Sequence, residues 1–335
     1  MYDKNVVTIN DIAREANVSI STVSRVLRGT VKVSESKREA VLAAVSELDY
    51  QPNIFARGLA SGQSMAIGVL TQNFGSPFYD AILQGVVQGL YGTGYFPIFA
   101  DGQWRSEIEY EAIMAMMQRQ IDGLIVIGGF LTPKELNQLS KQIPLIFVAR
   151  YLPDFEDQCI YIDNTLASYK ATKYLLELGH KRIAHISGRT DHPDAVARQR
   201  GYEMALEDAG VDIIQGLIVE GNFRRQSGVL AVETLLSRGI SFSAIFAAND
   251  QMAYGIRLGL YRRGIRVPED LSLVGFDDEP AASFMIPPLT TVRQPAEELG
   301  REAAEVLLAR LREETVCIPK LEAELVVRES TAIHL

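Results

Sequence analysis

Apolar residues near the start of the chain recur at the spacing of one helical face. They are Ile9, Ile12, Ala13 and Ala16. Thr8 is placed to cap this first helix, and Asp11, three residues later, is a short acidic partner for the exposed amides of the first turn. Asn17 and Val18 follow as a turn. The pattern predicts a short helix that ends in a tight turn.

Two more short helices are expected next, capped by Ser19 and by Ser34. In the second helix the inward residues are Val23, Val26 and Leu27, and the outward ones are Ile20, Ser21, Ser24 and Arg25. The third adds Val41, Ala44, Val45 and Leu48 to a small core. This arrangement is typical of a helix-turn-helix, whose second helix lays its N-terminal residues against base edges in the major groove of DNA. A three-helix bundle that docks onto protein is the alternative.

From about residue 63 onward the pattern changes to alternating strands and helices. The expected strands are 65–71, 95–100, 123–127, 145–148, 160–162, 182–187, 214–219, 244–247 and 271–276. The expected helices include 78–91, 106–119, 165–178, 196–209, 226–238, 250–263 and 296–312. Such alternation predicts parallel sheets covered by helices on both faces, here as two sheets in two lobes. Ligands of these folds bind beyond the carboxyl ends of the strands, so a cleft between the lobes is expected.

Length and composition fit a cytoplasmic protein with more than one domain. A chain of 335 residues is expected to form two or three domains. Hydrophobic residues make up 47% of the chain, without a run long enough to span a bilayer. Residues 1–5 lack the charged and apolar regions of a secretory signal, so export is not expected.

The net charge of −9 is distributed unevenly along the chain. Residues 1–60 carry 8 lysines and arginines against 7 acidic residues, whereas the remainder carries 25 against 35. The acidity therefore belongs to the larger part. The basic residues placed to approach phosphates are Arg25, Arg28, Lys32, Lys37, Arg38 and Arg57.

Candidate metal and cofactor chemistry is sparse. Cys159 and Cys317 are interpreted as buried small apolar residues in a reducing compartment, and the four histidines form no metal-ligand spacing with them. The sequence has no Gly-rich phosphate loop and no nucleophile elbow. Asp277 and Asp278 form a carboxylate pair that favours binding or turn structure. No cofactor, no metal and no enzymatic activity are therefore expected.

Polar and aromatic residues stand where several predicted strands end. Sugars require aromatic faces for their C–H surfaces and planar polar groups that bond two hydroxyls at once. Asn249 ends one apolar run, and Asp277 follows another. Asn249 and Asp250 could instead cap the next helix, as expected for Asp250. Phe78 and Phe223 could be ordinary core residues.

The N-terminal sequence resembles the LacI/GalR family of bacterial transcription regulators, and the resemblance continues through essentially the whole chain. The matching residues are Thr8, Asp11, Ile12, Ala13, Val18, Ser19, Thr22, Val23, Ser24, Arg25, Val26, Leu27, Tyr50, Pro52, Asn53, Ala56, Arg57 and Leu59. The resemblance implies that Ile20, Ser21 and Arg25 contact bases, and that Leu59 wedges into the minor groove from a hinge helix. The expected DNA-binding residues are Thr8, Ser19, Ile20, Ser21, Thr22, Ser24, Arg25, Asn53, Ala56 and Leu59.

The same resemblance implies an effector cleft. It places Arg198, Asn249, Asp277 and Gln294 there, with Phe223 at an aromatic position. Phe78 and Arg150 are expected to contribute from the opposite lobe. Ala149 departs from the polar residue often found at this point in sugar-responsive relatives.

The expected architecture is an N-terminal all-α helix-turn-helix domain (1–50), a hinge (51–62) and an α/β two-lobed sensor resembling periplasmic sugar-binding proteins (63–335). The lobes are expected at 63–161 with 291–321, and at 162–290 with 322–335. The expected function is a homodimeric repressor of a carbohydrate-utilisation operon, released from a palindromic operator by a mono- or disaccharide. A tail-built tetramer is not expected, because residues 325–335 leave no room for a coiled coil. The alternatives are a sugar-binding receptor without a regulatory role, an enzyme acting on a sugar, and a regulator that answers to a non-sugar metabolite.

Overall fold

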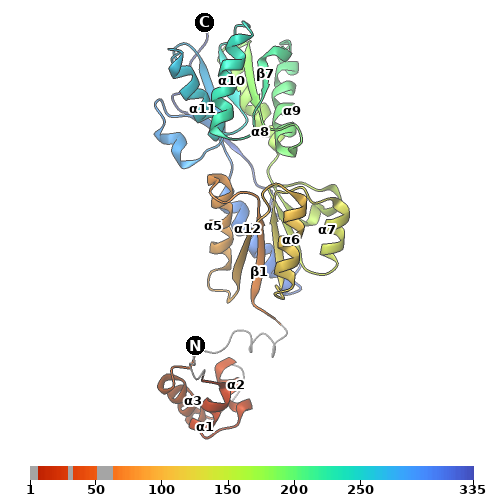
Figure 1. The fold of residues 1–335 in the computed structure, drawn as a ribbon, viewed down its shortest axis with the longest axis vertical. Helices are drawn as coiled ribbons and strands as arrows, with labels where there is room; N and C mark the ends of the chain where they lie inside the picture. Colours follow the sequence, from red (N-terminus) through yellow and green to blue (C-terminus); the bar gives the residue numbers. More distant parts are fainter. Residues whose placement is uncertain (1–6, 29–32, 51–62) are drawn as a thin grey trace. The chain divides into compact units, whose positions relative to one another are not determined.

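The computed structural model describes residues 7–28, 33–50 and 63–335, which divide between Met65 and Ala66 into two compact units (Figure 1). The smaller unit contains helices α1 (Ile9–Glu15), α2 (Ile20–Arg28) and α3 (Glu35–Glu47). Its buried core consists of Ile12, Ala13, Val23, Val41 and Ala44. The predicted helices and their inward faces are confirmed. Both the amide and the hydroxyl of Thr8 donate to Asp11 Oδ2, over 2.9 and 2.7 Å, so the predicted cap forms.

The larger unit contains two sheets. The first has the order β2-β1-β3-β4-β5 and is parallel throughout. Its strands are β1 (Ala66–Thr71), β2 (Phe96–Asp101), β3 (Gly123–Ile127), β4 (Leu145–Val148) and β5 (Cys159–Ile160). Helices α5 (Pro77–Leu90) and α12 (Ala296–Leu311) pack on one face, and α6 (Ser106–Met117) and α7 (Pro133–Ser140) pack on the other. We call this the first lobe; its central strands are buried on both faces, as parallel sheets require.

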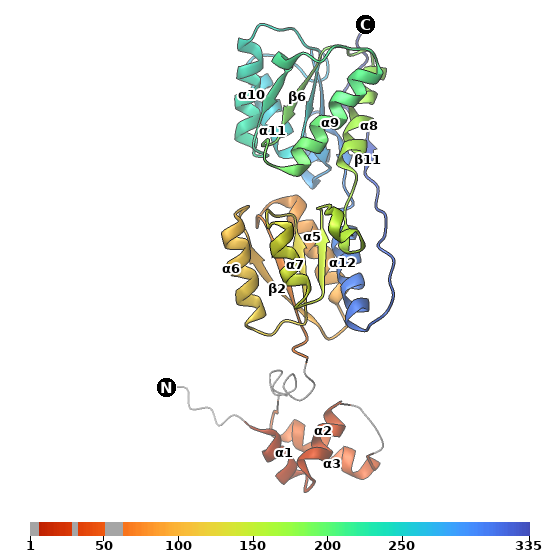
Figure 2. The ribbon, with the colours of Figure 1, turned by 90° about the vertical axis from the view of Figure 1, so that its right-hand side faces the viewer.

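The second lobe is built on a sheet of order β11-β10-β9-β8-β6-β7, in which only the pairing of β10 with β11 is antiparallel. Its strands are β6 (Ile183–Ser187), β7 (Ile218–Glu220), β8 (Ala244–Ala247), β9 (Ser272–Asp277), β10 (Thr290–Arg293) and β11 (Glu324–Val326). Helices α8 (Asn164–Glu177) and α9 (Pro193–Asp208) cover one face, and α10 (Arg225–Ser237) and α11 (Asp250–Arg262) cover the other. Short 3-10 helices span Pro153–Gln158, Gln215–Leu217 and Pro280–Phe284. The chain returns from α12 to β11 through a long connection (Figure 2).

The structure corrects three expectations. Residues 291–293 belong to β10 in the second sheet, so the chain crosses to the first lobe only after them. This strand was missed because its buried residues include Thr290 and Thr291, which interrupt the apolar run that marks the other strands. The strand expected at 214–219 begins with a 3-10 helix instead. Cys159 is buried as expected, but Cys317 is exposed, because it lies in the connection between α12 and β11.

No helix in the three described ranges combines the length and the apolar character that a membrane crossing would need.

Helices α5 and α12 of the first lobe pack in close contact. Both views show the two helices side by side. A Cβ at Gly85 would lie 1.9 Å from the carbonyl oxygen of Glu297, and one at Gly300 would lie 1.9 Å from that of Ile82. Two glycines therefore let the two backbones approach more closely than any side chain allows.

We expect Gly300→Ala to push α5 and α12 apart and to lower the free energy of unfolding by about 1–3 kcal/mol, the usual cost of overpacking. Urea unfolding would measure this loss as a lower midpoint with an unchanged slope. Gly89→Ala is a milder change for comparison and should cost less, because its Cβ would lie 2.8 Å from Ala304 Cβ and 2.9 Å from the carbonyl oxygen of Arg301, against 1.9 Å for the contact at Gly300. Equal midpoints for Gly300→Ala and the wild type would contradict the close approach.

Candidate functional site

The outward face of α2 is polar around one exposed apolar side chain. Ile20 is 50% exposed, and Ser21 and Arg25 are also exposed. Ser19 Oγ lies 2.9 Å from both Ser21 Oγ and Thr22 Oγ1, and it accepts from the Thr22 amide over 3.2 Å. These bonds fix the first turn of α2, where a recognition helix presents its side chains to bases.

The other predicted DNA-binding residues have separate positions. Ser24 is half-buried on α2, and Thr8 caps α1 through its bonds to Asp11. Asn53, Ala56 and Leu59 lie outside the described residues.

A cavity of about 460 Å³, here called the first cavity, lies between the two lobes. Five predicted effector residues line it: Phe78, Arg198, Phe223, Asn249 and Asp277. Phe78 comes from α5 of the first lobe, whereas the other four come from the second lobe. The first cavity therefore brings together residues from both sides of the expected cleft.

Arg198 is buried beneath the first cavity and bonded on several sides. Its Nε donates to Asn164 Oδ1 over 2.8 Å, and its Nη1 donates to the carbonyl oxygen of Ala248. Its Nη1 also lies 3.6 Å from Asp277 Oδ1. The guanidinium carbon stands 3.8 Å from the centre of the Phe276 ring, a cation–π contact. These contacts hold the guanidinium in one orientation.

Asp277 ends strand β9 in an unusual backbone conformation, with φ of +117°. Its Oδ1 accepts from Gln294 Nε2 over 2.7 Å. Burial raises the pKa of the Asp277 carboxyl to about 7; Arg198 opposes this rise, and Glu279 adds to it. The carboxyl group is therefore poised between its charged and neutral forms near neutral pH.

Asn249 and Asp250 are neighbours in the sequence but have different roles. Asn249 caps α11, because its Oδ1 accepts from the Met252 amide over 2.9 Å, and its Nδ2 donates to the Phe223 carbonyl over 3.1 Å. Asp250 was expected to be the cap, and this was wrong. The Asp250 carboxylate is fully buried and accepts from Thr291 Oγ1 and from the Glu279 amide, over 2.6 and 2.9 Å.

Arg150 and Gln294 do not line the first cavity but a neighbouring one of about 490 Å³, here called the second cavity. Arg150 donates from Nη2 to the Leu131 carbonyl over 2.8 Å. The amides of Phe130 and Leu131 donate to the buried Glu109 carboxylate over 2.9 and 3.1 Å. Arg150 therefore contacts and orders the loop after β3, as Glu109 does. Gln294 reaches the first cavity only through its bond to Asp277.

Several lining residues of the first cavity were missed from sequence. The most prominent are Trp104, Phe130, His192 and Asp194. The Trp104 ring lies 4.3 Å from the His192 ring and 5.2 Å from the Phe130 ring, measured between centroids. The signal that could have found Trp104 is its position as the only tryptophan, four residues after the end of a predicted strand.

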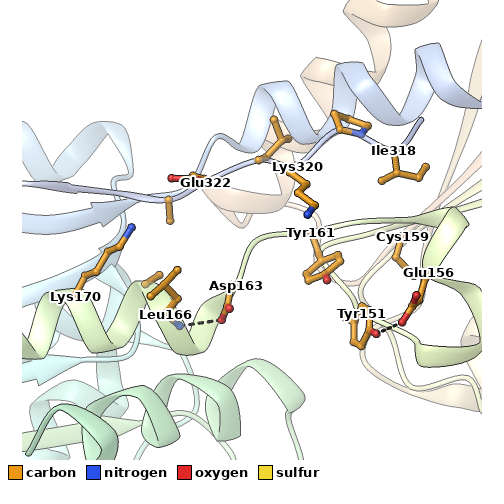
Figure 3. A pocket seen from close by; sticks show the side chains of 14 residues that line it. Tyr151, Glu156, Cys159, Tyr161, Asp163, Leu166, Lys170, Ile318, Lys320 and Glu322 are labelled. Atoms are coloured by element: carbon orange, nitrogen blue, oxygen red, sulfur yellow. Dashed lines mark hydrogen bonds between the residues drawn. The ribbon is translucent and has the colours of Figure 1, made fainter. Parts of the chain in front are cut away.

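A third cavity, of about 590 Å³, lies at the connections between the lobes (Figure 3). The rings of Tyr151 and Tyr161 lie 4.9 Å apart there, and the Tyr151 hydroxyl donates to Glu156. Lys170, Lys320 and Glu322 line its rim. This cavity contains none of the predicted effector residues, so the interlobe pair of cavities is the candidate site.

Comparison with known proteins matches both units. Residues 8–53 match the profile of bacterial regulatory proteins of the lacI family, and residues 172–331 match a periplasmic binding protein-like domain. The HTH-type transcriptional regulator GalR of Escherichia coli is 36% identical over 303 residues, which cover 90% of this chain and 88% of GalR.

Two solved structures extend the comparison to the fold. The lac repressor dimer bound to operator and the anti-inducer ONPF superimposes with a TM-score of 0.89 at 30% identity, covering 97% of this chain and 99% of that one. The complex of the transcriptional regulator CelR with cellobiose gives a TM-score of 0.71 at 36% identity, with coverage of 97% and 99%. The expected fold class is confirmed, and this chain belongs to the LacI family of bacterial regulatory proteins.

Proposed function

We propose that this chain is a sequence-specific transcription regulator that represses a carbohydrate-utilisation operon and leaves its palindromic operator when a sugar binds. The observation that carries the proposal is the presence, in one chain, of a helix-turn-helix unit and a cavity lined from both lobes of a binding-protein-like unit. In this proposal residues 1–50 read DNA and residues 63–335 bind the effector and dimerise, and the hinge is assigned to residues 51–62, which lie outside the described residues. The boundary between Met65 and Ala66 supports this division.

Charge balance in the first cavity favours a neutral effector. Its lining includes three carboxylates, of Asp101, Asp194 and Asp277, and three guanidiniums, of Arg189, Arg198 and Arg224. Such a lining offers many donors and acceptors, with acidic and basic residues in equal number. Sugar hydroxyls suit these groups, and the aromatic rings suit the C–H faces of a sugar.

Regulation rather than catalysis is the proposed activity, with DNA, a sugar and a second copy of the chain as partners. A receptor without a regulatory role would have no use for the polar face of α2. The cytoplasm, where operator DNA is found, is the proposed location.

The DNA-reading half of the proposal is tested with Arg25. Arg25→Ala in the full-length protein should weaken operator binding by about 1–3 kcal/mol, because an arginine that bonds guanine is lost. Gel-shift titrations on operator and on random DNA would measure the difference. Arg14→Ala is the matched control, because its side chain is 80% exposed on α1 and pairs with Asp11. Equal losses on operator and random DNA would assign Arg25 to phosphate contact alone.

The effector half is tested with Asp277. We propose that its carboxylate accepts from a sugar hydroxyl, which requires the ionised form. Since its pKa is about 7, sugar affinity should fall about tenfold between pH 8 and pH 6. Calorimetric titration across this range would measure the change.

Asp277→Asn is the control for this titration. It should bind sugar more weakly than the wild type at pH 8, and its affinity should not change between pH 8 and pH 6. It should also remain on operator at sugar concentrations that release the wild type. If the variant kept the wild-type pH profile, another group would be responsible for the proton linkage.

We further propose a homodimer, as a palindromic operator requires. Helices α5 and α11 lie on the same side of the larger unit (Figure 1). Exposed apolar side chains on or beside these helices and the nearby 3-10 helix are Tyr91 (89%), Tyr261 (70%), Phe284 (84%) and Ile286 (85%). Large exposed apolar surfaces of this kind mark protein interfaces.

Sedimentation equilibrium should give a dimer of 37.0 kDa chains. Phe284→Asp should shift the equilibrium toward monomer, because a charge would replace an apolar side chain that the proposed dimer buries. Val196→Asp on α9 is the control, since Val196 is also exposed (54%) but α9 lies on another side of the larger unit. A stable tetramer of the wild type would contradict the dimer. Equal dissociation by both variants would contradict the proposed surface.

A further inference from the structure

The third cavity, of about 590 Å³, is larger than either cavity of the proposed effector cleft and contains none of the predicted effector residues. Its volume falls in the range of about 300–1,000 Å³ typical of small-molecule sites. Its walls come from three parts of the chain (Figure 3). The first lobe contributes Tyr151, α8 of the second lobe contributes Leu166 and Lys170, and the connection from α12 to β11 contributes residues 318–323. A ligand in this cavity would contact both lobes and a segment that joins them.

The third cavity presents an exposed aromatic and apolar surface. Tyr151 is 45% exposed, Tyr161 is 37% exposed and Leu166 is 47% exposed. The two tyrosine rings lie 4.9 Å apart between centroids and are tilted by 44°, so they form one continuous aromatic surface. The half-buried side chains of Ile318 and Leu321 also line the cavity. A concave surface of this kind is typical of a site that holds the flat or apolar part of a small molecule.

The charged side chains around this surface differ in whether the chain itself already binds them. Two carboxylates are bound: Glu156 accepts from the Tyr151 hydroxyl, and Asp163 caps α8 by accepting from a backbone amide of that helix over 2.8 Å. The ammonium groups of Lys170 and Lys320 are different, because within the described residues neither forms an ion pair or a hydrogen bond. The two lysines are therefore the cations that a ligand in this cavity can use.

Glu322 is the remaining carboxylate of the lining, and its side chain is exposed. One such carboxylate stands against the two lysines, so the charged groups that a ligand can use are positive on balance. Figure 3 shows Lys320 extending toward the ring of Tyr161. An anionic group bound by Lys320 would therefore lie next to the aromatic surface. Lysine is a compact cation with three donors, which suits both carboxylates and phosphates.

We propose that the third cavity is a second ligand site, which binds a small molecule with a flat ring and an anionic group, a carboxylate or a phosphate. The ring packs on Tyr151 and Tyr161, the anionic group pairs with Lys320, and Lys170 adds favourable charge from α8. A ligand that contacts both lobes stabilises the lobe arrangement in which those contacts form. Tyr151, Tyr161 and Asp163 also line the second cavity, so this site adjoins the effector cleft without sharing its predicted effector residues.

Calorimetric titration of the full-length protein with matched pairs of probes tests the chemistry of this ligand. Benzoate is compared with benzyl alcohol, and adenosine monophosphate is compared with adenosine, because each pair shares a ring and differs in the anionic group. In at least one pair the anion should bind about tenfold more tightly than its neutral partner, the gain expected from a hydrogen bond to a charged group. The pair that shows this gain distinguishes a carboxylate ligand from a phosphate ligand.

Variants of exposed lining residues locate the bound anion. Lys320→Gln and Lys170→Gln should each weaken its binding by up to about tenfold, and Tyr161→Leu should weaken it about fivefold through the lost ring contact. Lys173→Gln is the matched control on α8, and Tyr110→Leu is the matched control on α6, where the tyrosine is 39% exposed. Neither control residue lines any of the three cavities, so the affinity for the anion should not change.

Three outcomes would overturn the second site. They are failure of all four probes to bind, equal affinity within both pairs, and an anion whose affinity is the same in Lys320→Gln, Lys170→Gln and Tyr161→Leu as in the wild type. A loss in Lys173→Gln equal to that in Lys170→Gln would also overturn it, because the effect would then come from net charge. None of these outcomes bears on the sugar-responsive regulator, which is tested separately through Arg25 and Asp277.

Discussion

The guanidinium of Arg198 holds together the face of the second lobe that forms the site. It joins the start of α8 through Asn164, the end of β8 through the Ala248 carbonyl, and the end of β9 through Phe276. A buried cation is costly unless hydrogen bonds and a nearby acidic group compensate it; here Nε and Nη1 are bonded, and Asp277 Oδ1 lies 3.6 Å from Nη1. Loss of this side chain would leave Asp277 buried without its cation. Arg198 therefore links α8, α9, β8 and β9 at the face of this lobe that forms the site.

Three acidic residues are buried close together after β8 and at the end of β9. Asp250, Asp277 and Glu279 are all buried, and burial raises the pKa of each carboxyl. Asp250 and Glu279 are linked by a hydrogen bond, and Gln251 also donates to Glu279. Asp277 alone among these three faces the first cavity, where a ligand hydroxyl can donate to it. Asp277 is therefore the one of these three carboxyls that a ligand in the first cavity can contact.

Much of this arrangement was predictable from the sequence, for identifiable physical reasons. Apolar periodicity located the helices of both units, and the resemblance placed Arg198 and Asp277 in the effector cleft; the structure has Arg198 on α9 and Asp277 at the end of β9, and both line the first cavity. Strand β10 was not predicted, because two of its buried residues are threonines rather than apolar residues. Trp104 and His192 were not predicted as site residues, because they lie on loops of different lobes. Their side chains come together only in the folded chain, and no spacing in the sequence indicates that contact. Arg150 was assigned to the cleft, but its bond to the Leu131 carbonyl is visible only in the folded chain.

The division of the site between two lobes determines whether binding can be transmitted. A ligand shifts a conformational equilibrium only by its difference in affinity between the two states. A ligand that contacted Arg198, Asn249 and Asp277 alone would touch one lobe and bind equally well in every lobe arrangement. Contacts to Phe78 and Trp104 from the first lobe make the affinity depend on how the lobes are arranged. Phe78, which could have been an ordinary core residue, and Trp104, which was missed from the sequence, are therefore the contacts that allow the site to act as a switch.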